Sequence, residues 1–239
     1  MSHPFRFKKF EILHDQSTMK VGTDAIVLGS WLKVDDDCKT ILDIGTGCGV
    51  IALMLAQRTK TIIHAIDIDE PSALEAEVNF NHSPWNDRLK IHQSSLEKFN
   101  PPSNIKYDLI VSNPPFFQNS LLPLSSRLQV AKHNVAFTME SFVANIHRLL
   151  ANDGKWAVIL PAEMKTRINS LAEENGYEML RNLNVFSKAG KPLTRIVAVF
   201  GMNNRANTEF ESLTIRGEDG RFTDQYKKLT QDYHPEGYL

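Results

Sequence analysis

The sequence predicts an α/β fold built from a mostly parallel sheet with helices on both faces. Short apolar runs, typical of buried strands, alternate with longer amphipathic stretches along most of the chain. A cluster of glycines separates the apolar run at residues 40–44 from a helical stretch, as in nucleotide-binding turns. With 239 residues, 42% of them hydrophobic, the chain can bury a sizeable core, so we expect one domain over residues 1–239.

The first half of the chain predicts four strands and two helices. Residues 40–44 are apolar and end in the glycine cluster, and residues 50–57 have the spacing of a helix. The same alternation then continues with strands at 62–66, 89–93 and 107–112 and a helix at 72–81.

The second half predicts two further helices and a hairpin. A helix at 139–150 precedes a strand at 155–160, which Pro161 closes because proline cannot donate to a strand ladder. A helix at 163–175 ends before Gly176, a residue that favours the left-handed backbone of a helix end. The remaining expected elements are strands at 177–186 and 194–200, joined by a hairpin-like connection at 187–192, and a short strand at 213–216 before a helix or loose tail.

Composition and charge argue against several classes of protein. A net charge of −1 disfavours a wholly basic polyanion-binding face, although it permits a local basic patch. Cys38 and Cys48 are too few for a disulfide framework and have no Cys-x-x-Cys partner, so we expect no metal site. The N-terminus lacks the apolar core of a signal peptide, and no apolar run approaches membrane-spanning length. We expect a soluble, cytoplasmic monomer.

The stretch Asn113-Pro114-Pro115-Phe116 carries the most specific chemistry in the sequence. The lone pair of an adenine amino group or a carboxamide is delocalised into its π system, so acceptors aimed at its N–H bonds are needed to localise it. The Asn113 side-chain oxygen and the carbonyl of Pro114 can supply two acceptors, and Phe116 can stack on the substrate plane. The same prolines could instead simply end the strand at 107–112.

The glycine cluster distinguishes between two kinds of nucleotide cofactor. Its spacing, Gly45, Gly47 and Gly49, brings the third glycine one residue too early for the dinucleotide fingerprint. With Asp43 before it, the run resembles motif I of the class I S-adenosylmethionine methyltransferases. That resemblance implies S-adenosyl-L-methionine as cofactor, contacts from these four residues, and a Rossmann-like, seven-stranded, mostly parallel sheet with a terminal antiparallel hairpin. Asp67 ends the next strand, where a carboxylate takes the ribose hydroxyls.

One position departs from many class I enzymes, which carry Asp after the third strand to hold the cofactor adenine. This chain has Ser95 there, and a hydroxyl gives a weaker contact without charge assistance. We expect Ser95 to contact the adenine and Asn113 to contact the cofactor as well as the substrate. Asp69 and Glu70 fit the charged start of a helix.

The opening of the chain carries a second resemblance. Residues 7–10, 14–15 and 19–31 resemble the start of the bacterial tRNA1(Val) adenine-N6 methyltransferase family, and the resemblance continues to residues 190–195. It implies an N-terminal segment over 1–35 that covers cofactor and substrate, a catalytic core over 36–201, and a C-terminal strand and tail over 202–239.

The same resemblance implies that Thr23 and Asp24 lean over the methionine end of the cofactor, with the Asp24 carboxylate available to its ammonium group. The residues alone also fit a helix for which Thr23 is the N-cap and whose apolar side packs on the core. Both interpretations remain open at this point.

A tRNA substrate requires cations that meet its phosphates. The stretch between residues 179 and 208 is basic without any acidic residue, and further cations follow the Asn-Pro-Pro-Phe loop, although solvated charges explain such runs equally well. The residues expected to contact RNA are Phe117, Lys132, His133, Lys188, Lys191 and Arg195. His133 could also act as a base, but a protonated methylated amine loses its proton readily to water.

We therefore predict methylation of the N6 amino group of adenine 37 in tRNA1(Val), with Asn113, Pro114 and Phe116 as catalytic residues. The alternatives are a protein glutamine-N5 methyltransferase, whose loop is also Asn-Pro-Pro-aromatic, an RNA guanine-N2 enzyme and a DNA adenine-N6 enzyme. A silent nucleotide-binding module and an NAD-dependent oxidoreductase belong to other classes, and the cofactor that the purified protein retains would separate them.

Overall fold

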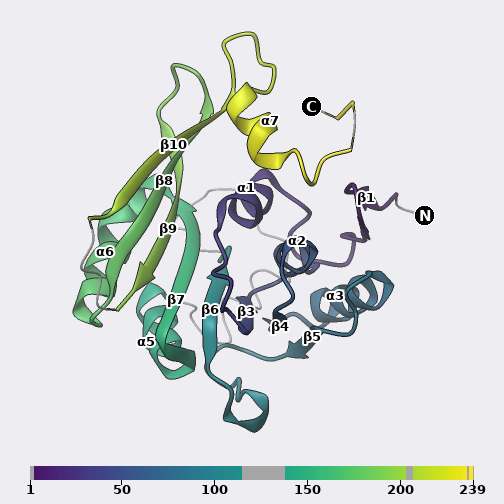
Figure 1. Ribbon diagram of the computed structural model, residues 1–239, viewed down its shortest axis with the longest axis vertical. Helices are drawn as coiled ribbons and strands as arrows, with labels where there is room; N and C mark the ends of the chain where they lie inside the picture. Colours follow the sequence, from purple (N-terminus) through teal and green to yellow (C-terminus); the bar gives the residue numbers. More distant parts are fainter. Residues whose placement is uncertain (1–2, 115–137, 203–206, 236, 239) are drawn as a thin grey trace.

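An eight-stranded sheet lies at the centre of the computed structural model, which describes residues 3–114, 138–202, 207–235 and 237–238 (Figure 1). Its strands are β3 (Thr40–Ile44), β4 (Ile62–Asp67), β5 (Leu89–Gln93), β6 (Tyr107–Ser112), β7 (Leu150–Pro161), β8 (Glu178–Lys188), β9 (Leu193–Gly201) and β10 (Glu209–Arg216). They follow the order β10-β8-β9-β7-β6-β3-β4-β5 across the sheet. A separate antiparallel pair is formed by β1 (Phe5–Arg6) and β2 (Glu11–Ile12).

Helices cover both faces of the sheet, as predicted. They are α1 (Thr23–Trp31), α2 (Val50–Arg58), α3 (Glu70–His82), α5 (Met139–Leu149), α6 (Lys165–Glu174) and α7 (Asp224–Thr230), with short 3-10 helices η1 (Pro102–Asn104) and η2 (Ala162–Met164). Side chains of α1, α2, α3 and α7 share one buried apolar cluster, and those of α5 and α6 share the other. In β3, Ile41 belongs to the first cluster and Leu42 and Ile44 to the second, because neighbouring strand side chains point to opposite faces.

The strand pairing confirms the predicted change of direction. The neighbours β5, β4, β3, β6 and β7 are parallel, whereas β9 is antiparallel to both β7 and β8. The fold is therefore the expected Rossmann-like one with its antiparallel terminal hairpin.

The predicted strand count is wrong by one, because β10 joins the sheet as an eighth strand, parallel to β8. The sequence predicted only its last residues, 213–216, because 209–212 are exposed at the sheet edge and lack an apolar alternation. Arg181 of β8 secures this edge by ion pairs to Glu209 (3.1 Å) and Glu211 (2.6 Å).

Several element boundaries also differ from the prediction. β7 starts at Leu150, directly after α5, instead of at residue 155. The helix expected at 163–175 is divided into η2 and α6. Gly176, with φ of 80°, has the left-handed backbone predicted for the end of α6.

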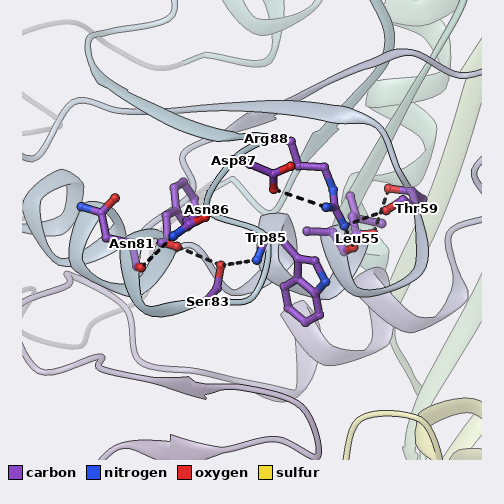
Figure 2. A network of polar contacts seen from close by, with 10 residues as sticks. Leu55, Thr59, Asn81, Ser83, Trp85, Asn86, Asp87 and Arg88 are labelled. Atoms are coloured by element: carbon purple, nitrogen blue, oxygen red, sulfur yellow. Dashed lines mark hydrogen bonds and ion pairs between the residues drawn. The ribbon is translucent and has the colours of Figure 1, made fainter.

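The carboxyl end of α2 is held by an arginine from the loop before β5. Nη2 of Arg88 donates to the carbonyls of Ala56 (2.8 Å) and Thr59 (3.0 Å), and Asp87 pairs with the same guanidinium at 3.5 Å (Figure 2). These carbonyls would otherwise lack partners at the helix end, where the macrodipole also favours a cation. Arg88 therefore ties α2, which begins at the glycine cluster, to the following βα unit.

Candidate active site

Three strands end side by side at one edge of the sheet. Ile44, the last residue of β3, pairs in register with Ile66 of β4 on one side and Ser112 of β6 on the other. The Ser112 hydroxyl also donates to the Ile44 carbonyl at 2.8 Å. The next residues along these strands, Gly45, Asp67 and Asn113, therefore share the carboxyl edge, where open α/β sheets bind their ligands.

The first two glycines of the turn leave room for a ligand. Gly45 and Gly47 have φ of 67° and 56°, a backbone that strains other residues. A Cβ built on Gly45 would meet nothing within 4 Å, and one on Gly47 would meet only the Met19 carbonyl at 4.0 Å. The backbone can therefore be approached closely at both positions, as the predicted cofactor contacts require.

The third glycine has a packing role. Gly49, with φ of 87°, is the N-cap of α2, and a Cβ there would lie 2.5 Å from Cε1 of Phe80 in α3. This close contact explains the glycine without a ligand, and the expected cofactor contact of Gly49 stays a prediction.

Asp67 is held rigidly at the tip of β4. Its carboxylate accepts the Gly47 N–H at 2.8 Å on one oxygen and the Asp69 N–H at 2.9 Å on the other, and the side chain is 8% exposed. Burial raises its pKa, and the two backbone donors act against that shift. Each oxygen keeps a second lone pair for a hydroxyl. Asp69 caps α3 by accepting the Ser72 N–H at 3.0 Å, which confirms its expected place at a helix start.

Asp43 lies beneath the glycine turn and is fully buried. Its Oδ2 accepts the Thr46 hydroxyl at 2.6 Å. Burial raises the pKa of this carboxyl to about 7, and the Thr46 bond opposes the rise. The geometry favours a role in shaping the turn, and direct contact of Asp43 with the cofactor stays a prediction.

The raised pKa of Asp43 predicts that its contribution to stability falls as pH rises from about 4 to about 7, because the folded protein retains a proton that the unfolded chain releases. Asp43→Asn removes this term, so its melting temperature should fall less than the wild type's over that interval. The largest difference corresponds to on the order of 4 kcal/mol. Scanning calorimetry measures it, with exposed Asp37→Asn as the control. Parallel profiles for wild type and Asp43→Asn would contradict the assignment.

A polar face of α3 holds the N-terminal segment in place. Glu75, which is 5% exposed, accepts the backbone N–H groups of Asp15 (2.8 Å), Gln16 (2.9 Å) and Ser17 (2.9 Å). It also accepts the Ser17 hydroxyl at 2.6 Å. One buried carboxylate thus fixes three consecutive peptide groups, and we call this set of contacts the Glu75 clamp.

Two more residues of α3 extend this clamp. Asn79 bonds both the N–H and the carbonyl of Leu13, each at 2.8 Å, and donates to the Cys48 carbonyl of the glycine turn at 2.8 Å. The Ser72 hydroxyl accepts the Thr18 N–H at 3.1 Å. Sequence reasoning missed Ser72, Glu75 and Asn79, although their helical spacing is a signal that three polar side chains share one face.

The clamped segment brings the start of α1 to the candidate site. Its N-cap is Gly22, whose φ of −125° and ψ of 164° are extended, and no side chain caps the helix. The expectation that Thr23 is the N-cap is therefore wrong, since Thr23 is already the first helical residue. A glycine can end the extended segment there without a hydroxyl cap at little cost.

Asp24 and Arg195, predicted for different ligands, contact each other. Nε of Arg195 lies 2.9 Å from Oδ2 of Asp24, and both side chains are about a third exposed. Arg195 pairs with Pro161, so the ion pair lies at the carboxyl end of β7. The structure thus joins the α1 side and the β9 side of the site, and the expected contacts of both residues with ligands stay predictions.

The structure describes some of the other predicted site residues and not the rest. Lys188 and Lys191 lie at the β8–β9 connection, on the same sheet edge as Arg195. Ser95 follows the end of β5, which pairs with Asp67, and is half-buried. Pro114 is buried and Asn113 half-buried. Outside the described residues lie Phe116, Phe117, Lys132 and His133.

The described ranges hold neither a metal-binding cluster nor a membrane-spanning helix. Within them, no group of three or more His, Cys, Asp or Glu side chains could hold a metal ion. Among the helices described, none is long and apolar enough to cross a membrane.

Solved structures show the class of fold. A predicted O-methyltransferase from Agrobacterium tumefaciens superposes with a TM-score of 0.68 at 16% identity, covering 88% of this chain and 96% of that one. Magnesium protoporphyrin IX methyltransferase from Synechocystis, solved with bound S-adenosylmethionine, gives 0.53 at 16% identity, covering 77% and 81%. The chain has the Rossmann-like fold of these methyltransferases.

Sequence comparisons show to which methyltransferase family the chain belongs. Residues 16–187 match the family model of the methyltransferase small domain. Proteins called tRNA1(Val) (adenine(37)-N6)-methyltransferase are 37% identical in Parabacteroides distasonis, over 98% of this chain and 99% of theirs, and 39% identical in Tolumonas auensis, over 97% of both. The chain belongs to this methyltransferase family.

Proposed function

We propose that this protein transfers a methyl group from S-adenosylmethionine to the N6 amino group of adenine 37 in tRNA1(Val). The observation that carries the proposal is the register of β3, β4 and β6, which brings Gly45, Asp67 and Asn113 to one sheet edge. Family relatives over the full length bear the name of this activity.

The residues at this edge fit the cofactor. Asp67 would take the ribose hydroxyls, the open backbone at Gly45 and Gly47 would lie against the ligand, and Ser95 would face the adenine. Asp24 would offer its carboxylate to the ammonium group, in which case Arg195 shares that carboxylate. When bound, S-adenosylmethionine supplies an electrophilic methyl group whose carbon–sulfur bond breaks as the substrate nitrogen attacks, leaving a neutral thioether.

The chain's contribution to the reaction is to hold the amino group in line. The Asn113 side-chain oxygen and the Pro114 carbonyl accept the two N–H bonds, which localises the nitrogen lone pair toward the methyl group. The Ser112 bond to Ile44 fixes the start of this loop against β3. After transfer, the nitrogen loses one proton to water, so no strong base is required. Phe116 would stack on the base.

The target base must leave its stack to reach this edge, which costs least in a single-stranded loop. Lys188, Lys191 and Arg195 lie on the same edge and would meet phosphates near the loop. Phe117, Lys132 and His133, which lie outside the described residues, would add further contacts to the RNA. We propose further that residues 1–239 act as one domain, with 1–35 covering the site, and that the protein works as a cytoplasmic monomer.

The proposal is tested by incubating the protein with methyl-labelled S-adenosylmethionine and an unmodified tRNA pool. We expect label in N6-methyladenosine after digestion, mapped to position 37 of tRNA1(Val), and none in the same tRNA with adenine 37 replaced by guanine. Label in guanosine or in added protein would instead support one of the alternative enzymes, and purified protein that retains NAD would contradict the cofactor.

A further inference from the structure

The two ends of the chain meet beside α7. The Lys8 N–H donates to the Tyr233 carbonyl at 2.7 Å, and the rings of Phe5 and Tyr238 meet edge to face at 6.0 Å. Figure 1 shows β1 beside the C-terminal residues, at the upper right. Segments from opposite ends of the sequence therefore build one surface.

This surface contains a cavity of about 390 Å³, here called the terminal cavity, lined by Lys8, Lys227, Lys228 and His234 among others. Two of these lysines come from α7 and the third, Lys8, from the turn between β1 and β2. Within the described part of the chain none of them forms an ion pair, whereas Arg181 and Arg195 both do. The cavity therefore presents positive charge to a ligand.

An exposed aromatic ring stands at the same surface. Tyr238 is 47% exposed, and its ring stacks on His234 with centroids 4.3 Å apart and planes 12° apart. His234 is itself 1% exposed, so it supports Tyr238 from below. Lysines beside a supported, exposed aromatic ring are the chemistry with which proteins bind nucleic-acid backbone and stack bases.

α7, which carries two of the lysines that line the terminal cavity, starts at the same edge of the sheet as the candidate site. β10 ends at Arg216, which pairs with Lys188, and α7 starts soon afterwards. Thr223, the N-cap of α7, donates its N–H to Ile215 at 3.0 Å. Because α7 has seven residues, it extends about 10 Å from this anchor. Part of an RNA whose loop enters the site can reach the lysines of α7.

We propose that the terminal cavity binds the phosphate backbone of the substrate RNA, away from the reacting base. The three lysines neutralise phosphates, and Tyr238 offers its exposed ring to a base or ribose. This inference rests on the proposed function, because it requires an RNA substrate.

The test replaces Lys227 and Lys228 by alanine. The tRNA dissociation constant, measured from 50 to 200 mM salt, should rise about tenfold at the lowest salt, and the slope of log K against log salt should fall by about 2. At saturating tRNA the turnover should stay at the wild-type value, as should the affinity for S-adenosylhomocysteine. The matched control is Lys60→Ala/Lys90→Ala. Both lysines are exposed and lie near the starts of β4 and β5, at the edge of the sheet away from the candidate site.

Two single variants test the same cavity independently. Lys8→Ala, from the other end of the chain, should lower the salt slope by about 1. Tyr238→Ala should weaken binding about fivefold or more with an unchanged slope, because stacking releases no counterions. Unchanged tRNA affinity in the double variant and in Lys8→Ala, or an equal loss in the control, would overturn the inference while leaving the proposed function intact. Absence of RNA methylation by the wild type would overturn both.

Discussion

Asn113→Ala is expected to lose methyl transfer by about 10² to 10³-fold in kcat, the usual cost of one transition-state hydrogen bond, and to lose far less of its cofactor affinity. Asn113 directly follows β6, and Ser112 before it is anchored to Ile44. The loop start should therefore keep its position when the carboxamide is removed. What is lost is the acceptor that localises the nitrogen lone pair, an interaction needed mainly in the transition state.

Three measurements define this result. Single-turnover kinetics with saturating tRNA report the chemical step, calorimetry with S-adenosylhomocysteine reports cofactor affinity, and thermal melting reports folding. Asn113→Asp keeps two acceptor oxygens and should retain more activity than Asn113→Ala, while exposed Asn100→Ala serves as the control. Turnover of Asn113→Ala within a few-fold of the wild type would exclude the role given to this carboxamide.

The sequence was sufficient to predict which residues meet at the carboxyl edge of the sheet. The elements around Gly45, Asp67 and Asn113 are local, because each is a short apolar run followed by turn-forming or polar residues, and their strands agree with the prediction. Parallel neighbours with aligned ends then bring the residues together without knowledge of side-chain contacts. The chemistry expected of Asn113 and Pro114 was inferred from the identity of these residues alone.

Contacts between distant segments could not be predicted in the same way. The Asp24–Arg195 pair joins positions 171 residues apart, and nothing local in either stretch specifies the partner. The first half of β10, residues 209–212, was not predicted, because an exposed edge strand has no apolar period to detect. The Glu75 clamp was hidden for a related reason, since a helix whose polar residues bond backbone groups of another segment has the same pattern as a solvated helix face.

The Glu75 clamp has the second large expected effect. Glu75→Ala leaves the N–H groups of Asp15, Gln16 and Ser17 without their acceptor. Hydrogen bonds to a charged group contribute about 1.5–3 kcal/mol each, but the freed segment can recover bonds to water, so the free energy of unfolding should fall by about 2–4 kcal/mol. Glu77→Ala, exposed on the same helix, should leave it unchanged.

The loss should extend to the cofactor, because the clamped segment leads through Met19, whose carbonyl faces Gly47, to Asp24. If binding requires residues 19–24 in this arrangement, a variant that populates it a tenth of the time binds about tenfold more weakly. We therefore expect the dissociation constant of S-adenosylhomocysteine to rise about tenfold or more in Glu75→Ala, with faster amide hydrogen exchange confined to the N-terminal segment and α1. A destabilised variant with unchanged cofactor affinity would show that the clamp serves the fold alone. Weaker cofactor binding, with the amides of the sheet still protected from hydrogen exchange, would make Glu75 a positioning residue of the site.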